Sequence, residues 1–130
     1  MSHQISKTAA VIFTLLVSGA MLTNNYKFIY APNESLIELT SSYQVSHFAA
    51  WQVDYLLSRG FSPGAKNEFG TSAYNMAFID KNIALLEVMP KYMTKSEVKV
   101  HMVSIEEYPT SDADLKEVAL ESLKSQLHKN

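Results

Sequence analysis

LLSRGFSPGAKNEFGTSAYNMA, residues 56–77, is the stretch that decides the fold of this chain. Gly60 stands where the end of a helix needs a residue in the left-handed conformation, and Pro63 follows shortly after it. Gly70 stands where a tight hairpin turns back, and the hydroxyl of Ser72 is placed to cap the first amide groups of a new helix. The stretch therefore predicts a helix, a hairpin and a second helix in immediate succession.

The same stretch resembles the junction between two ankyrin repeats. A repeat of that family is about 33 residues long, ends its second helix with two leucines and a glycine, forms a hairpin, and restarts with a glycine and a Thr-Pro-Leu-His-like helix opening. Leu56, Leu57, Gly60 and Gly70 stand at the corresponding points of this chain. The period agrees with the resemblance, because Leu56 and Met89, like Val53 and Leu86, stand one repeat length apart.

The chain also departs from the ankyrin pattern. Ala73 replaces the usual proline, Asn75 the usual histidine, and Pro90 falls where the second leucine is expected. Met93 replaces the next glycine, so no third copy is visible. The resemblance covers residues 35–93 and is clearest over 53–89.

The chain after residue 31 carries helical patterns throughout. We expect helices over five segments, which are 34–42, 43–58, 72–78, 82–89 and 111–127. In the last segment, Ser111 followed by Asp114 forms a capping-box pattern. Its apolar stripe consists of Leu115, Val118, Ala119, Leu123 and Leu127.

The predicted fold class is all-α, with an ankyrin-like helix-turn-helix unit over residues 35–93. Two repeats are fewer than the three or so that normally stand alone, since each leaves an apolar face that needs a neighbour. We therefore expect residues 94–130 to form a helical cap, made by the segment 94–108 and the C-terminal helix.

Residues 1–23 are predicted to be a signal peptide or a membrane anchor. Residues 8–22 carry no charge, and Ser18-Gly19-Ala20 offers small residues to a signal peptidase. This apolar run is shorter than the roughly 20 residues that a membrane-crossing helix prefers. Cleavage after Ala20 is the first interpretation, an uncleaved anchor the second, and a buried core helix the third. Residues 24–34 are expected to be a linker.

Composition narrows the possible functions. The chain has 130 residues, of which 47% are hydrophobic and 18% charged, as in an ordinary globular domain. Its net charge is −2, and no run of lysine or arginine could follow a phosphate backbone, so we expect no nucleic-acid partner. There is no cysteine, which excludes disulfides, thiolate metal sites and thiol nucleophiles.

No catalytic motif is recognisable, and we expect no enzymatic activity, metal or cofactor. The four histidines are scattered without metal-ligand spacing: His3, His47, His101 and His128. Glu106 and Glu107 are adjacent on a helix end, where a solvated surface is a better interpretation than a buried acid/base pair. A small hydrolase with a dispersed site is the remaining enzymatic alternative.

Recognition of a protein is the function that the ankyrin resemblance implies. Partners of that family are held by hairpin tips and inner-helix faces, which here means Lys66, Asn67, Glu68, Phe69, Thr71, Asn75 and Phe78. Phe69 stands out because it is a large ring at a hairpin tip, and packing against the next hairpin or on residues 32–36 is the alternative. Trp51 is the second candidate for recognition, but filling the core near the start of its helix is its first interpretation.

The sequence therefore predicts a protein-binding module, such as an inhibitor, immunity factor or adaptor. It is exported to the periplasm or the exterior if cleaved near Ala20, and otherwise tethered to the membrane by residues 8–22. The alternative is a single-pass membrane subunit of a larger complex with a soluble helical domain.

Overall fold

The computed structural model describes residues 7–16 and 32–129. The chain divides into two compact units, Met1–Ala31 and Pro32–Asn130. In the first unit, residues 7–16 are helical and expose their apolar side chains to solvent. The predicted cleavage point at Ala20 and most of the predicted linker lie outside the described residues. Within the described parts of the chain, no helix reaches the length and apolarity that a membrane crossing requires.

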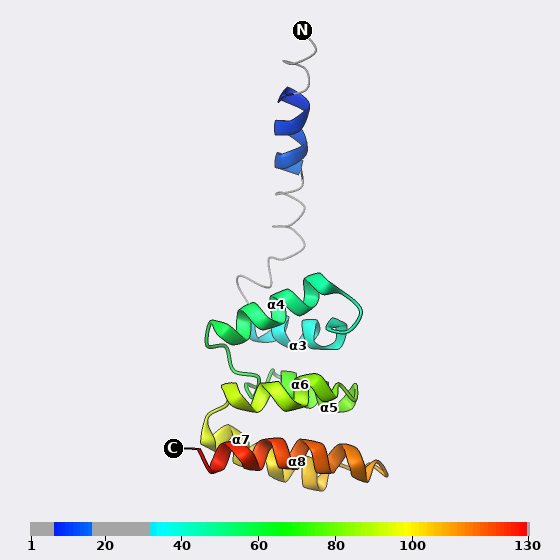
Figure 1. The fold of residues 1–130 in the computed structure, drawn as a ribbon, viewed down its shortest axis with the longest axis vertical. Coiled ribbons are helices and arrows are strands. Elements are labelled where there is room, and N and C mark those ends of the chain that lie inside the picture. The colour runs from blue at the N-terminus through cyan, green and yellow to red at the C-terminus, as the bar shows by residue number, and fades with distance from the viewer. Residues whose placement is uncertain (1–6, 17–31, 130) are drawn as a thin grey trace. The chain divides into compact units, whose positions relative to one another are not determined.

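Every named element of the second unit is a helix, and residues 32–129 contain no β-strand, which confirms the predicted all-α class. Its elements in chain order are α3 (Pro32–Ser42), α4 (His47–Ser58), α5 (Ala73–Ile79), α6 (Ile83–Val88), the 3-10 helix η1 (Met89–Tyr92), α7 (Lys95–Glu107) and α8 (Ala113–Leu127). Successive helices pack in pairs, and Figure 1 shows the α3–α4, α5–α6 and α7–α8 pairs lying in layers. α3 packs on α5 and α6 on α8, so each layer contacts the next.

Local signals place the helix ends. Gly60 (φ 91°) and Gly70 (φ 77°) both adopt the left-handed conformation, as the sequence predicts. The Ser72 hydroxyl accepts a hydrogen bond from the backbone amide of Asn75, and the Asn75 side chain accepts one from the backbone amide of Ser72 in return. Thr94 and Glu97 form the same reciprocal capping box at the start of α7.

Three predicted helix boundaries are wrong, each for a local reason. α3 begins at Pro32 rather than at residue 34, because proline is well suited to the first turn of a helix. Residues 43–45 form a turn, and α4 begins only after Ser46, whose side chain accepts from the Ala49 amide. Pro90 does not end the helical run, since the chain continues through η1 with this proline in its first turn.

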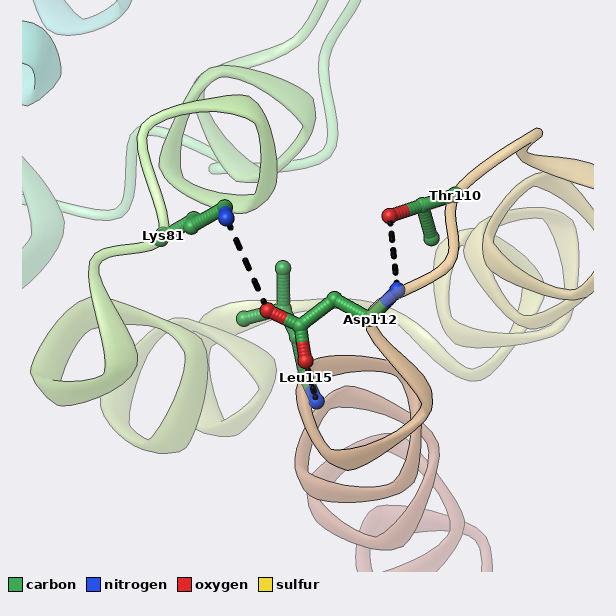
Figure 2. A network of polar contacts seen from close by, with 4 residues as sticks. All are labelled: Lys81, Thr110, Asp112 and Leu115. Atoms are coloured by element: carbon green, nitrogen blue, oxygen red, sulfur yellow. Dashed lines mark hydrogen bonds and ion pairs between the residues drawn. The ribbon is translucent and has the colours of Figure 1, made fainter.

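The start of α8 also differs from the prediction (Figure 2). Asp112, and not Ser111, is the capping residue: its Oδ1 accepts from the Leu115 amide at 3.0 Å, and its own amide donates to Thr110 Oγ1 at 3.1 Å. Its Oδ2 lies 3.7 Å from Lys81 Nζ in the turn between α5 and α6. Because that lysine is mostly exposed, the ion pair contributes at most about 1 kcal/mol.

The core runs through all three layers. Its fully buried side chains include Leu36, Val53, Leu56, Tyr74, Leu86, Met89, Val98, His101, Ile105 and Leu123. From the predicted stripe of α8, Leu115, Ala119 and Leu123 are buried, whereas Val118 and Leu127 are half-buried. The last two helices are thus as much a part of the core as the first four.

Candidate protein-binding surface

The hairpin between α4 and α5 is closed by its own hydrogen bonds. The Asn67 amide donates to the Thr71 carbonyl at 2.8 Å, and Lys66 pairs with Ser72 in an antiparallel bridge. The Asn67 side-chain oxygen accepts from the amides of Phe69 and Thr71, both at 3.0 Å. These bonds and the left-handed Gly70 stabilise the conformation of the tip, because the asparagine oxygen supplies acceptors for two backbone amides of the turn.

Two contacts fasten the base of the hairpin to α7. Ser62 donates a hydrogen bond to the Glu97 carboxylate, and Ser72 Oγ lies 2.9 Å from His101 Nε2. On its other side, His101 Nδ1 donates to the Glu97 carbonyl at 2.7 Å, since that oxygen can only accept. The hairpin is therefore held at both ends by side chains of one helix.

Burial sets the electrostatics of this contact. Desolvation lowers the pKa of His101 below its usual value, and the positive charge of Lys66 acts in the same direction. Burial pushes the pKa of Glu97 upward, but hydrogen bonds from Ser62 and Thr94 outweigh it and hold this pKa below its usual value. The folded state therefore favours a neutral imidazole beside an ionised carboxylate.

The Ser72–His101 pair has the spacing of a nucleophile and its base, but its surroundings exclude that role. Ser72 is 0% and His101 1% exposed, so a substrate cannot reach either side chain. The Ser72 hydroxyl also caps α5 by accepting from the Asn75 amide at 3.1 Å. The pair is structural, and residues 7–16 and 32–129 contain no group of three or more histidines and carboxylates suited to a metal ion.

The structure brings together most, but not all, of the predicted binding residues. Lys66, Glu68 and Phe69 project from the hairpin into solvent, and Asn67 and Thr71 are half-buried beneath them. Phe69 is 81% exposed, so it packs neither on a neighbouring hairpin nor on residues 32–36. These five predicted residues therefore lie together at the tip of the hairpin.

Two predicted members lie elsewhere. Asn75 is occupied by the capping box, and its side-chain nitrogen reaches Ser104 Oγ on α7 at 3.4 Å. Phe78 is 2% exposed and packs edge-to-face on Tyr108, with the ring centroids 5.2 Å apart. Including Phe78 in the binding surface is wrong, because α7 and its following turn cover this part of α5.

A second exposed feature, the α4 aromatic row, consists of Phe48, Trp51 and Tyr55. Neighbouring rings stack at centroid distances of 5.8 and 5.7 Å, and the three side chains are 45%, 57% and 41% exposed. The expectation that Trp51 fills the core is wrong. α4 carries apolar residues around most of its circumference, and a helix at the end of a stack can bury only one side of them.

His101 is the residue that sequence reasoning missed. It lies three residues after Val98 and four before Ile105, both of which are buried on α7. That spacing places His101 on the buried face of any helix over this segment. The position of the histidine, rather than its distance from other histidines, was the usable signal.

Comparison with known proteins finds no family model, no curated protein and no solved structure that matches this chain.

Proposed function

We propose that this chain is a non-enzymatic protein-binding module that recognises its partner through the hairpin tip formed by Lys66, Asn67, Glu68, Phe69 and Thr71. One observation carries the proposal. Phe69 exposes 81% of its surface at the tip of a hairpin that internal hydrogen bonds hold in shape. Exposing a large ring in water is unfavourable, and central aromatic side chains are the commonest anchors of protein interfaces.

The surroundings of Phe69 support the same function. The hairpin does not need to be ordered on binding, because it is anchored at its base to Glu97 and His101. A pre-organised surface loses less entropy on association than a mobile loop. Lys66 and Glu68 place both charge signs beside the ring, as in the polar rim of an interface.

We further propose that the helical unit is built of degenerate ankyrin-like repeats. The layered helix pairs, the left-handed glycines at positions 60 and 70 and the hairpin between α4 and α5 support this organisation. In this arrangement α7 and α8 cap the α5–α6 layer. The proposed binding surface would then correspond to the hairpin tips that repeat proteins of this kind use.

The binding proposal is tested at Phe69. A photo-crosslinking phenylalanine derivative at position 69 of the full chain, expressed in its native host, would identify the partner. For that purified partner, we expect Phe69→Ala to weaken affinity about 30-fold, because an anchor contributes about 2 kcal/mol. The melting temperature of the Phe69→Ala chain should stay unchanged, since the ring makes little contact with the rest of the fold.

Tyr92→Ala is the matched control, because Tyr92 is also an exposed aromatic residue but lies in η1. It should leave the affinity of the partner unchanged. Equal binding by Phe69→Ala and the parent chain would show that the hairpin tip is not the interface.

A membrane subunit is the second candidate, favoured by a different observation. The helix over residues 7–16 exposes Val11, Ile12, Phe13, Leu15 and Leu16 to solvent. A cluster of exposed apolar side chains of this kind is normally covered by a protein neighbour or by lipid, unless the segment is cleaved from the protein. An anchored subunit retains this segment, whereas an exported module loses it.

The N-terminus of the mature protein separates these candidates. We expect processing after Ala20, so mass spectrometry of the protein from fractionated host cells should find Met21 as the first residue. The soluble product would then appear in the exported fraction. An intact N-terminus in protein that resists carbonate extraction would establish the anchored subunit instead.

A further inference from the structure

The α4 aromatic row is a surface separate from the hairpin. α4 buries Ala49, Gln52, Val53, Leu56 and Leu57 against the rest of the unit. The row lies on the remaining circumference, and Figure 1 shows that the α3–α4 pair forms the end layer of the helical unit. Three stacked rings at the surface are a contiguous apolar patch rather than scattered apolar residues.

The size of the patch limits what can cover it. A fully exposed aromatic side chain presents about 150 to 250 Å². At the exposures of these three rings, the patch contributes roughly 200 to 350 Å². Two such patches face to face bury about 400 to 700 Å², which is less than the roughly 1,200 Å² of a permanent complex. A partner of similar size would therefore form a weak, reversible complex.

Two polar groups of complementary character flank the row and suggest the partner. His47 and Asp54 are exposed, seven residues apart, and therefore lie along the same line of the helix surface. With a rise of about 1.5 Å per residue, Asp54 lies about 4.5 Å from Trp51 along the axis in one direction, and His47 about 6 Å in the other. Trp51 thus lies near the midpoint between an acceptor and a donor.

We infer that two copies of this chain pair through α4 in an antiparallel arrangement, about a two-fold axis at Trp51. That axis brings Asp54 of one copy to within about 1.5 Å, along the helix, of His47 in the second copy. Each His47 imidazole can then donate a hydrogen bond to the Asp54 carboxylate of the other copy, so the bond forms twice in each dimer. A parallel arrangement would instead put the two Asp54 carboxylates at the same height, where they repel each other.

The absence of cysteine allows a direct test in the full chain. His47→Cys and Asp54→Cys chains, each with its own tag, are expressed together in the native host and oxidised with copper phenanthroline. We expect a disulfide between the two different chains. Either variant alone should give little product, because its two cysteines would lie about 9 to 12 Å apart along the helix.

Two further variants establish the specificity of the pairing. Trp51→Ala in both chains should reduce the mixed disulfide at least tenfold, and circular dichroism should show an unchanged fold because Trp51 is exposed. Phe69→Ala should leave it unchanged, since the hairpin is a separate surface. The inference would be overturned if either cysteine variant alone formed the disulfide as efficiently as the mixture, or if the mixture formed none. It would also be overturned if Trp51→Ala did not reduce the yield of the mixed disulfide.

Trp51 is the only tryptophan, so its fluorescence distinguishes a lipid surface from a second copy. The full chain in mild detergent should show an emission maximum that shifts to longer wavelength on dilution, as the pairs separate. In a chain that begins at Met21 and so keeps the whole compact unit Pro32–Asn130, phosphatidylcholine vesicles should not reverse this shift. A blue shift that requires vesicles and ignores protein concentration would assign the row to the membrane and overturn the dimer.

Discussion

Deletion of residues 111–130 is expected to unfold the whole helical unit, with no cooperative melting transition left near room temperature. α8 buries Leu115, Ala119 and Leu123 against α6, η1 and α7. Burial of a large apolar side chain contributes about 1.5 to 3 kcal/mol, and the deletion would also expose the side chains on which α8 packs. The total loss is comparable with the net stability of a small domain, which is about 5 to 15 kcal/mol.

Polar contacts are lost in the same deletion. The buried Tyr74 hydroxyl donates to the Ala119 carbonyl at 3.3 Å, and the deletion leaves this donor without its acceptor. Burial also raises the pKa of Tyr74, so the hydroxyl is protonated and able to donate near neutral pH. Because water can reach this hydroxyl once α8 is removed, loss of the hydrogen bond adds about 0.5 to 1.5 kcal/mol to the cost.

Thermal melting followed by circular dichroism checks this prediction. A chain that ends at Leu127 is the control: it loses the exposed His128 and Lys129 and should melt within a few degrees of the full chain. If the long deletion melted as the full chain does, α8 would be an independent tail. The proposed cap would then have to be abandoned.

Replacement of His101 by alanine is expected to lower the stability by about 2 to 4 kcal/mol near neutral pH, as for other large-to-small changes in a core. The ring packs edge-on against Tyr74, with centroids 5.4 Å apart, and contacts Ser72 and the Glu97 carbonyl. Without the imidazole, the base of the hairpin keeps its Ser62–Glu97 hydrogen bond to α7 but loses the contact at Ser72. We therefore also expect faster proteolysis within residues 62–72.

The pH dependence of stability identifies the same residue. Because the pKa of His101 is lowered in the folded state, the unfolded chain binds this proton first as the pH falls. The contribution of His101 to the free energy of unfolding is then fully present above the usual histidine pKa of 6.5, and it decreases as the pH falls below that value. Glu97 adds a second decrease below pH 4.5, since its folded pKa is also lowered.

Urea unfolding at a series of pH values separates the two pH ranges in which stability decreases. The decrease that begins below the usual histidine pKa should disappear in His101→Gln, which cannot titrate, and persist in His47→Ala, which removes an exposed histidine. The second decrease, assigned to Glu97, should remain in both variants. If the stability of the parent chain stayed constant from neutral pH down to pH 4.5, where the Glu97 decrease begins, the assignment to His101 would be contradicted.

The site was only partly predictable from the sequence. Phe69 and its hairpin could be placed because asparagine, glycine and serine determine turn geometry within a few residues. Phe78 was misplaced because its burial depends on Tyr108, which follows α7 and is therefore distant in the chain. Ser62, Glu97 and His101 went unrecognised as one cluster, because nothing in their spacing shows that α7 packs beneath the hairpin.

The sequence by itself determined the all-helical class, the hairpin at residues 66–72, the left-handed glycines and the cap at Ser72. These features depend on backbone conformations and hydrogen bonds between residues close in the chain. Tertiary structure alone decided that Ser62, Glu97 and His101 form one cluster, that Phe78 is buried and that Trp51 is exposed. Each of these outcomes depends on which helix faces which, and α4 has more apolar side chains than its neighbours can cover.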